Sequence, residues 1–221
     1  MRAVFFAAGL VLATPLAFAG DDPMAGYVGN TSISIDNNGV TTHVFYRADN
    51  LFAAKRASTT GTGAWALQGD KLCLTYDRPA HSNSVCVPVE PHRVGDVWIH
   101  GDRHVTLVAG QELNDTPEVL AALAAASRVG NTEVAKDPDG TETRLYWRPD
   151  HTFSATRPGW QTEGIWGVKG SSLFLHYNVA RPNMGSDEEM KNATPRKVGE
   201  TWDMADRKAT LVAGEQLQQP K

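Results

Sequence analysis

Two histidines, His100 and His104, bracket a short segment, Gly101–Arg103, that is typical of a tight turn between two strands. If those strands pair, the two imidazoles would meet and the aspartate of the turn would be a third ligand, a set that a divalent cation accepts. A similar segment later in the chain has Met204 and Lys208 at the two histidine positions, and no further ligand is evident. Metal binding at His100 and His104 is therefore a secondary hypothesis, and we expect no cofactor.

An arginine followed two residues later by an aspartate occurs twice, as Arg47 with Asp49 and as Arg148 with Asp150. At the end of a strand such a pair is typical of a surface ion pair or a turn cap, and the pattern favours that interpretation. The alternative is a polar ligand-binding site that is present in two copies. All four residues are therefore candidate binding residues.

Among the tryptophans Trp160 is the better candidate for a ligand contact, with packing in the core as the alternative. It follows Pro158-Gly159 and has no counterpart elsewhere in the chain, which favours an exposed side chain. Trp65 and Trp166, in contrast, lie in Gly-x-Trp segments and are expected to pack in a core, because a buried indole contributes a large apolar surface.

The familiar catalytic motifs are missing from the sequence. It contains neither the G-x-S-x-G motif of a serine nucleophile nor the glycine-rich motifs that bind phosphate. We therefore name no catalytic residue and expect the protein not to be an enzyme. The formal net charge of −4 predicts no basic surface for nucleic acid, so a nucleic-acid partner is not expected either.

The first 19 residues have the pattern of a cleavable signal peptide. Arg2 precedes an apolar run over 3–15, and Ala17–Ala19 has the small-x-small form of a cleavage site. The apolar run is too short to span a bilayer. The sequence therefore predicts an exported protein, periplasmic or secreted, that does not span the membrane once residues 1–19 are removed.

The only two cysteines, Cys73 and Cys86, flank a turn-rich stretch with strand-like segments on either side. An even number of cysteines in an exported chain favours a disulfide, and a hairpin would bring these two together. Two buried free thiols are the alternative.

The mature chain contains two copies of one unit. Val28–Thr31 matches Val129–Thr132 at a separation of 101 positions, as from Gly29 to Gly130. Thr106–Gly110 matches Thr210–Gly214 at 104 positions, so the second copy has three extra residues before its end. Repetition over nearly the whole length indicates a tandem duplication.

Within each copy apolar and polar residues alternate with the period of a β-strand, and glycine-containing turns separate the segments. Each copy is predicted to be an antiparallel meander of about six to eight short strands. One helix is expected at about 117–127, with Asp115–Thr116 as its cap and Pro117 in its first turn. The fold class is thus mainly β, with two curled sheets or partly open barrels, at 20–114 and 115–221, and the helix between them.

Both copies share the order G-N-T, then Y/W-R-x-D, then G-x-W-x-x-x-G-x-x-L, which runs over Gly29–Cys73 and Gly130–Phe174. This pattern resembles an uncharacterised proteobacterial family of small exported β domains, in which a cysteine follows the last leucine. The second copy departs from the pattern at Phe174. The resemblance implies export and a compact β unit, and it carries no catalytic residue over to this chain.

Duplication of a unit without a catalytic motif favours a non-enzymatic module that binds a periplasmic protein or a cell-envelope component. In that hypothesis the long loop at 179–195 and the turn before Trp160 form one contact face. A small-molecule carrier that uses the curled interior of each unit is the alternative, and an enzyme is the least favoured of the three.

Overall fold

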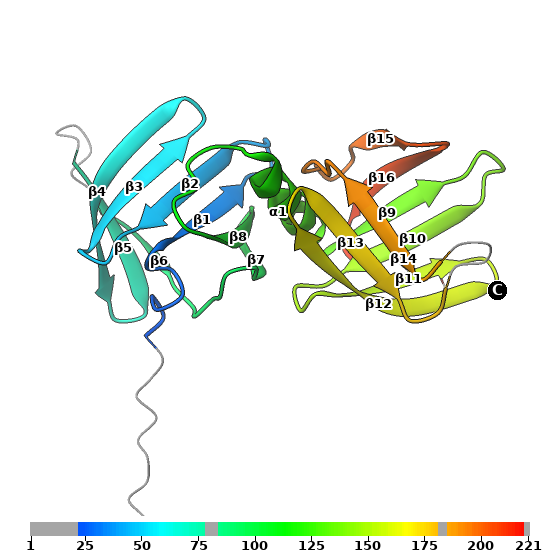
Figure 1. Ribbon diagram of the computed structural model, residues 1–221, viewed down its shortest axis with the longest axis horizontal. Helices are drawn as coiled ribbons and strands as arrows, with labels where there is room; N and C mark the ends of the chain where they lie inside the picture. The colour runs from blue at the N-terminus through cyan, green and yellow to red at the C-terminus, as the bar shows by residue number, and fades with distance from the viewer. Residues whose placement is uncertain (1–21, 78–83, 181–184, 219–221) are drawn as a thin grey trace, which may run out of the picture.

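The structure is a computed structural model that describes residues 22–77, 84–180 and 185–218. These residues form two eight-stranded antiparallel sheets with one helix between them (Figure 1). The predicted mainly β fold with two tandem curled units is thereby confirmed. Residues 1–19 lie outside the described residues, so the signal peptide stays a prediction. No helix in the described part of the chain is long and apolar enough to cross a membrane.

The first sheet, called unit 1, has the strand order β6-β5-β4-β3-β2-β1-β8-β7. Its strands are β1 (Asn30–Ile35), β2 (Thr41–Tyr46), β3 (Leu51–Arg56), β4 (Thr59–Gln68), β5 (Lys71–Tyr76), β6 (Val85–Pro88), β7 (Val97–His100) and β8 (Arg103–Ala109).

The second sheet, called unit 2, repeats this order as β14-β13-β12-β11-β10-β9-β16-β15. Its strands are β9 (Asn131–Lys136), β10 (Glu142–Trp147), β11 (Thr152–Arg157), β12 (Trp160–Lys169), β13 (Ser172–Tyr177), β14 (Asp187–Lys191), β15 (Thr201–Met204) and β16 (Arg207–Ala213).

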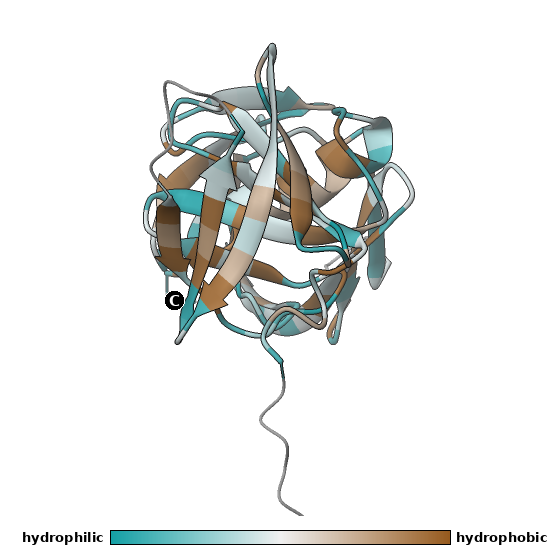
Figure 2. Cartoon of the chain, turned by 90° about the vertical axis from the view of Figure 1, so that its left-hand side faces the viewer, coloured by the Kyte–Doolittle hydropathy of each residue, from teal (hydrophilic) through white to brown (hydrophobic). Residues whose placement is uncertain are grey.

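Each unit has the topology of an up-and-down barrel that is left open at one seam. The first strand pairs with both the second and the eighth, as it would in a closed barrel. Among the described residues β6 does not pair with β7, nor β14 with β15. The apolar interior of each sheet includes Phe52 and Trp65 in unit 1 and Phe153 and Trp166 in unit 2. Figure 2 looks toward unit 1 and shows how its sheet curls.

The Gly-x-Trp segment has a steric cause. A Cβ atom at Gly63 would collide with the carbonyl oxygen of Thr75 and with the ring of Phe52, and Gly164 is enclosed in the same way. Two positions later the Trp65 indole donates to the carbonyl of Arg47 over 3.0 Å, an interaction that unit 2 repeats. The tryptophans of this segment are therefore core residues, as predicted.

The G-N-T motif joins the first strand of each unit to the segment after the last strand. The Thr31 hydroxyl donates to the carbonyl of Gly110 over 2.6 Å, and Thr132 donates to Gly214 over 2.7 Å. The motif is therefore structural, since it closes the sheet between β1 and β8 and between β9 and β16.

Helix α1 (Pro117–Arg128) begins as the sequence predicts. Thr116 is its N-cap, its side chain accepts from the Val119 amide, and Pro117 lies in the first turn, where its missing N–H costs nothing. The predicted C-terminal end, at 127, is one residue short of the observed one.

The helix packs against both units and fixes one relative to the other. Val119 and Leu123 pack on Ile33 and Ile35 of β1, whereas Ala125 and its neighbours belong to the core of unit 2. The sequence assigns the helix to the second unit, but its N-terminal half covers the first.

The predicted disulfide is confirmed. Cys73 in β5 lies directly opposite Cys86 in β6, and the two sulfurs are bonded at 2.06 Å. In unit 2 the same register places Phe174 opposite Glu189, so the second unit has no covalent link between its corresponding strands.

Candidate binding cleft between the two units

His100 and His104 do not form the metal site considered from their spacing. In the β7–β8 hairpin His100 pairs with Arg103 and Ile99 pairs with His104, so the two imidazoles project from opposite faces. The expectation that they meet is wrong because of this register. No group of three potential metal ligands occurs in the part of the chain that the structure describes.

His104 instead faces helix α1. The backbone of Ala126 hydrogen-bonds its ring, and its Nδ1 atom is buried without a hydrogen-bond partner among the described residues. Burial lowers the pKa of His104, and the bond to Ala126 opposes this only in part. The imidazole is therefore neutral near pH 7.

His104 also lines a cleft between the two units, with a volume of about 330 Å³. Unit 1, α1 and unit 2 all contribute to its walls. The lining residues are Ile35, Asp36, Asn37, His104, Ser127, Arg196, Lys197 and Val198.

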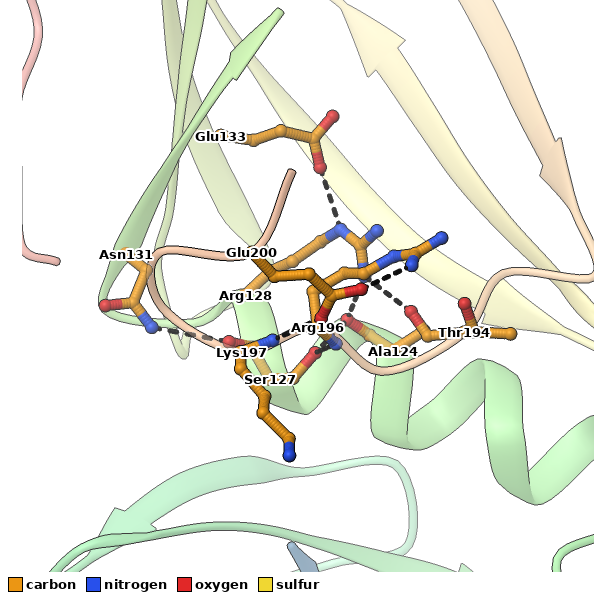
Figure 3. Close-up of polar contacts among 9 residues, drawn as sticks. All are labelled: Ala124, Ser127, Arg128, Asn131, Glu133, Thr194, Arg196, Lys197 and Glu200. Carbon is orange, nitrogen blue, oxygen red and sulfur yellow. Dashed lines mark hydrogen bonds and ion pairs between the residues drawn. The ribbon is translucent and has the colours of Figure 1, made fainter. Parts of the chain in front are cut away.

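Arg196 is held in the cleft wall by contacts on several sides. Its guanidinium lies 4.7 Å from the centre of the Trp202 ring and donates to Glu200 over 2.7 Å. Its backbone amide donates to the Ser127 hydroxyl over 3.0 Å (Figure 3). Its Nε is buried and has no hydrogen-bond partner among the described residues.

Arg128, the last residue of α1, supports this wall from inside unit 2. Its guanidinium donates to Glu133 over 2.9 Å, and both side chains are nearly inaccessible, at 3% and 5% (Figure 3). It also donates to the carbonyls of Ala124 and Thr194. These bonds attach the end of the helix to β9 and to the segment that carries Arg196.

Lys197 connects the units directly at the cleft. Its Nζ donates to the carbonyl of Asn38 in the β1–β2 turn over 2.7 Å. Gly39 makes room for this contact, because a Cβ atom there would lie 2.6 Å from the Lys197 Cε. The approach of the lysine therefore depends on the lack of a side chain in the turn.

Asp36 is the acidic residue among those that line the cleft, and its carboxylate already has hydrogen-bond and ion-pair partners. It accepts from the Val40 and Asn38 amides and pairs with Arg56 at 2.7 Å. The bond from Val40, together with that from Arg56, lowers the pKa of Asp36, so the carboxylate is ionised.

The arginine–aspartate pairs lie elsewhere. Arg47 and Asp49 form an exposed ion pair at 2.6 Å in the β2–β3 turn. In unit 2 Arg148 instead donates to Ser154, while Asp150 accepts from Thr152. The bonds from Thr152 lower the pKa of Asp150. None of these four predicted residues lines the cleft.

Trp160 is buried, with 7% of its surface exposed, so the expectation of an exposed ring is wrong. Its indole donates to the carbonyl of Ala180 over 3.1 Å and packs near Tyr177. The turn before Trp160 does therefore lie next to the start of the 179–195 segment.

Part of that segment, Asp187–Lys191, forms strand β14 where a long loop was expected. Glu188 faces the interior of unit 2, where the Tyr177 hydroxyl donates to it over 2.9 Å and Arg207 lies 3.7 Å away. Next to these groups is a cavity of about 20 Å³, room for about one water molecule. Residues 181–184 of the segment lie outside the described residues.

Arg196 and Lys197 were missed at the level of sequence. The only signal was the departure from the repeat, since the three extra residues of the second copy fall in the segment before Val198. Comparisons with protein-family models, with curated proteins and with solved structures found no match.

Proposed function

We propose that the protein is an exported, non-enzymatic module that binds a protein or cell-envelope ligand, part of which enters the cleft between the units. The observation that carries this proposal is the cleft of about 330 Å³, whose walls are fixed by a helix packed into both units. Ligand sites occur preferentially at domain interfaces, in clefts of about 300–1,000 Å³.

The free polar groups of the cleft favour an acidic ligand group. Lys197 has three N–H donors, of which the bond to Asn38 uses one, and Arg196 has further donors beyond its bond to Glu200. The carboxylate of Asp36 is already satisfied by Arg56 and by backbone amides. A carboxylate or phosphate would accept from the donors that remain.

The interior of unit 2 offers little support for the carrier hypothesis. Its cavity of about 20 Å³ is far below the volume of a ligand pocket. The space between the units therefore supports binding better than this interior does.

Charge reversal at Lys197 tests the proposal. Mature protein is immobilised and exposed to a periplasmic and envelope extract, with Lys197→Glu as the variant. Lys191→Glu is the matched control, because Lys191 is an exposed lysine of β14 that does not line the cleft. We expect wild type and Lys191→Glu to retain one component that Lys197→Glu retains at least tenfold less.

Hydrogen exchange on the retained complex locates the contact. Protection should appear at 35–38 and 196–198, the two walls of the cleft. Equal capture by wild type and Lys197→Glu, or protection confined to other surfaces, would contradict the proposal.

Export belongs to the same proposal and has its own test. The Cys73–Cys86 disulfide supports an oxidising compartment. N-terminal sequencing of the protein from its host is expected to start at Gly20, and an uncleaved chain in the cytoplasmic fraction would refute export.

A further inference from the structure

The outer face of β1 and β8 in unit 1 is covered by helix α1. Ile33 and Ile35 of β1 and Val108 of β8 form one apolar cluster with Val119 and Leu123 of the helix. Ile33 is fully buried by this contact. Figure 1 shows α1 between the two sheets. There it packs on this face of unit 1.

The same face of unit 2 has no helix on it in the described part of the chain. The repeat places Val134 of β9 and Val212 of β16 where Ile33 and Val108 stand in unit 1. Both valines are only partly buried. The second unit thus keeps two aliphatic residues of a helix-packing face without the helix.

Lysines have replaced two further residues of this face, whereas its threonines are retained. Lys136 and Lys208 lie directly opposite each other in the register, at the positions of Ile35 and His104. Like charges directly opposite in a sheet are destabilising. A partner with acidic groups would relieve that repulsion, whereas an apolar partner would not.

The neighbouring carboxylates leave this positive charge partly uncompensated. Asp203 stands opposite Lys208 in the register but approaches its ammonium only to 4.0 Å, with both side chains largely exposed. Glu142 stands opposite Lys136, but its carboxylate is paired with Arg144 at 2.8 Å. Lys136 makes no ion pair with any residue that the structure describes.

We propose that this face, defined by Val134, Lys136, Lys208 and Val212, binds an amphipathic helix of a partner protein. The helix would carry two aliphatic residues four positions apart, as α1 carries Val119 and Leu123, and acidic residues beside them. Unit 1 supplies the packing precedent, and the opposed lysines supply the charge complementarity. This surface differs from the cleft between the units and does not depend on it.

The test uses the full mature protein and a 15-residue helical peptide. The peptide has valine and leucine four positions apart and glutamates at the flanking positions. In methyl NMR we expect it to shift the resonances of Val134 and Val212. The Lys136→Glu/Lys208→Glu variant should bind it at least tenfold more weakly.

The matched control is Lys169→Glu/Lys191→Glu, which changes the net charge of unit 2 equally on strands β12 and β14. It should bind as wild type does, and a peptide with lysines in place of the glutamates should not bind.

Three outcomes would overturn the proposal. The first is that neither valine shifts, and the second is that Lys136→Glu/Lys208→Glu binds the acidic peptide as tightly as wild type. The third is that the two lysines bind a second copy of the chain or an anionic membrane in place of a helix. Sedimentation would then show a homodimer that the variant disrupts, or vesicles of anionic lipid would bind wild type but not the variant, without binding of the peptide.

Discussion

Around the equivalent residues Trp98 and Trp202, the two units place different side chains at corresponding positions. In unit 1 Tyr27 and His92 pack on Trp98, with the imidazole stacked on the indole at 3.7 Å between ring centres. The Tyr27 hydroxyl donates to the carbonyl of Glu90 over 3.2 Å. This end of the unit is thus filled by aromatic rings and one neutral hydrogen bond.

Unit 2 replaces both residues with arginine. Arg128 and Arg196 lie over Trp202, and Arg128 donates to Thr194 over 3.2 Å, at the position of Glu90. A buried arginine needs a carboxylate, which Glu133 supplies where unit 1 has a serine. Duplication thus kept the backbone bonds and introduced charged side chains into the interior of unit 2, next to the cleft.

Removing the buried carboxylate is expected to have the largest effect. Glu133→Ala leaves the Arg128 charge buried without its partner, which should cost about 4 kcal/mol of unfolding free energy. Ser32→Ala, the equivalent change in unit 1, loses only a hydroxyl contact with Tyr46 and should cost about 1 kcal/mol or less. Urea denaturation followed by tryptophan fluorescence measures both.

A double change tests whether the two fillings are interchangeable. Arg128→Tyr/Glu133→Ser gives unit 2 the residues of unit 1 and should lose less stability than Glu133→Ala, because no charge remains buried alone. A double variant less stable than Glu133→Ala would show that the two interiors differ beyond these positions.

The disulfide is the next largest difference between the units. Cys73→Ser/Cys86→Ser should lower the unfolding free energy by about 3 kcal/mol, because the unfolded chain gains freedom between the two positions. Reductant should lower the stability of wild type and leave the variant unchanged. Equal responses to reductant would mean that the bond does not contribute to stability.

Much of this architecture could be predicted from sequence because its causes are local or repeated. The alternation of apolar and polar residues predicted the strands, and the Thr116 cap with Pro117 predicted the start of the helix. The two cysteines on either side of a turn predicted the disulfide. Each of these signals lies within a few residues or is present twice.

The cleft could not be predicted, because its residues meet only in the folded chain. Whether His104 faces α1 depends on the hairpin register, and a shift of one residue would have turned it to the other face. Trp160 is buried by the segment at Ala180, twenty residues away. Nothing next to Lys197 in the sequence indicates its contact with Asn38 in the other unit.

Acid should weaken the unit 1 side of the cleft. Burial lowers the pKa of His104, so the unfolded chain, with an imidazole pKa of about 6.5, binds protons more readily than the folded one. The contribution of neutral His104 to the free energy of unfolding is fully present above about pH 6.5. It is lost as the pH falls through the lower pKa that the imidazole has in the folded state. Unit 2 has Lys208 at this position, so the histidine contribution is specific to unit 1.

His104→Gln should therefore reduce the slope of unfolding free energy against pH between about pH 7 and pH 5. His92 contributes in the same direction, since burial also lowers its pKa, so His92→Gln should reduce the slope as well. Urea denaturation at several pH values measures these slopes, and a slope unchanged in His104→Gln would contradict the assignment.

The smallest expected effect comes from alanine substitutions at two equivalent glycines. They separate the contact of Lys197 with the β1–β2 turn from the backbone strain of that turn. Gly39 and Gly140 occupy equivalent turns with φ values of 77° and 85°. Alanine at either position should cost about 1 kcal/mol, because a left-handed conformation is unfavourable for a residue with a Cβ atom. At Gly39 the new Cβ would also lie 2.6 Å from the Cε of Lys197, which is too close, whereas at Gly140 it would lie 3.9 Å from the Cε of Lys136, an ordinary contact distance.

Gly39→Ala should therefore displace the Lys197 ammonium from Asn38 at little additional cost in stability, because a long exposed side chain moves readily. Gly39→Ala should therefore retain less of the ligand in the capture assay than Gly140→Ala, which leaves the cleft intact. Urea denaturation should find the two variants equally stable within about 0.5 kcal/mol. If both variants capture the ligand equally well, the position of Lys197 is unimportant for binding, and the cleft donors must be sought at Arg196 alone.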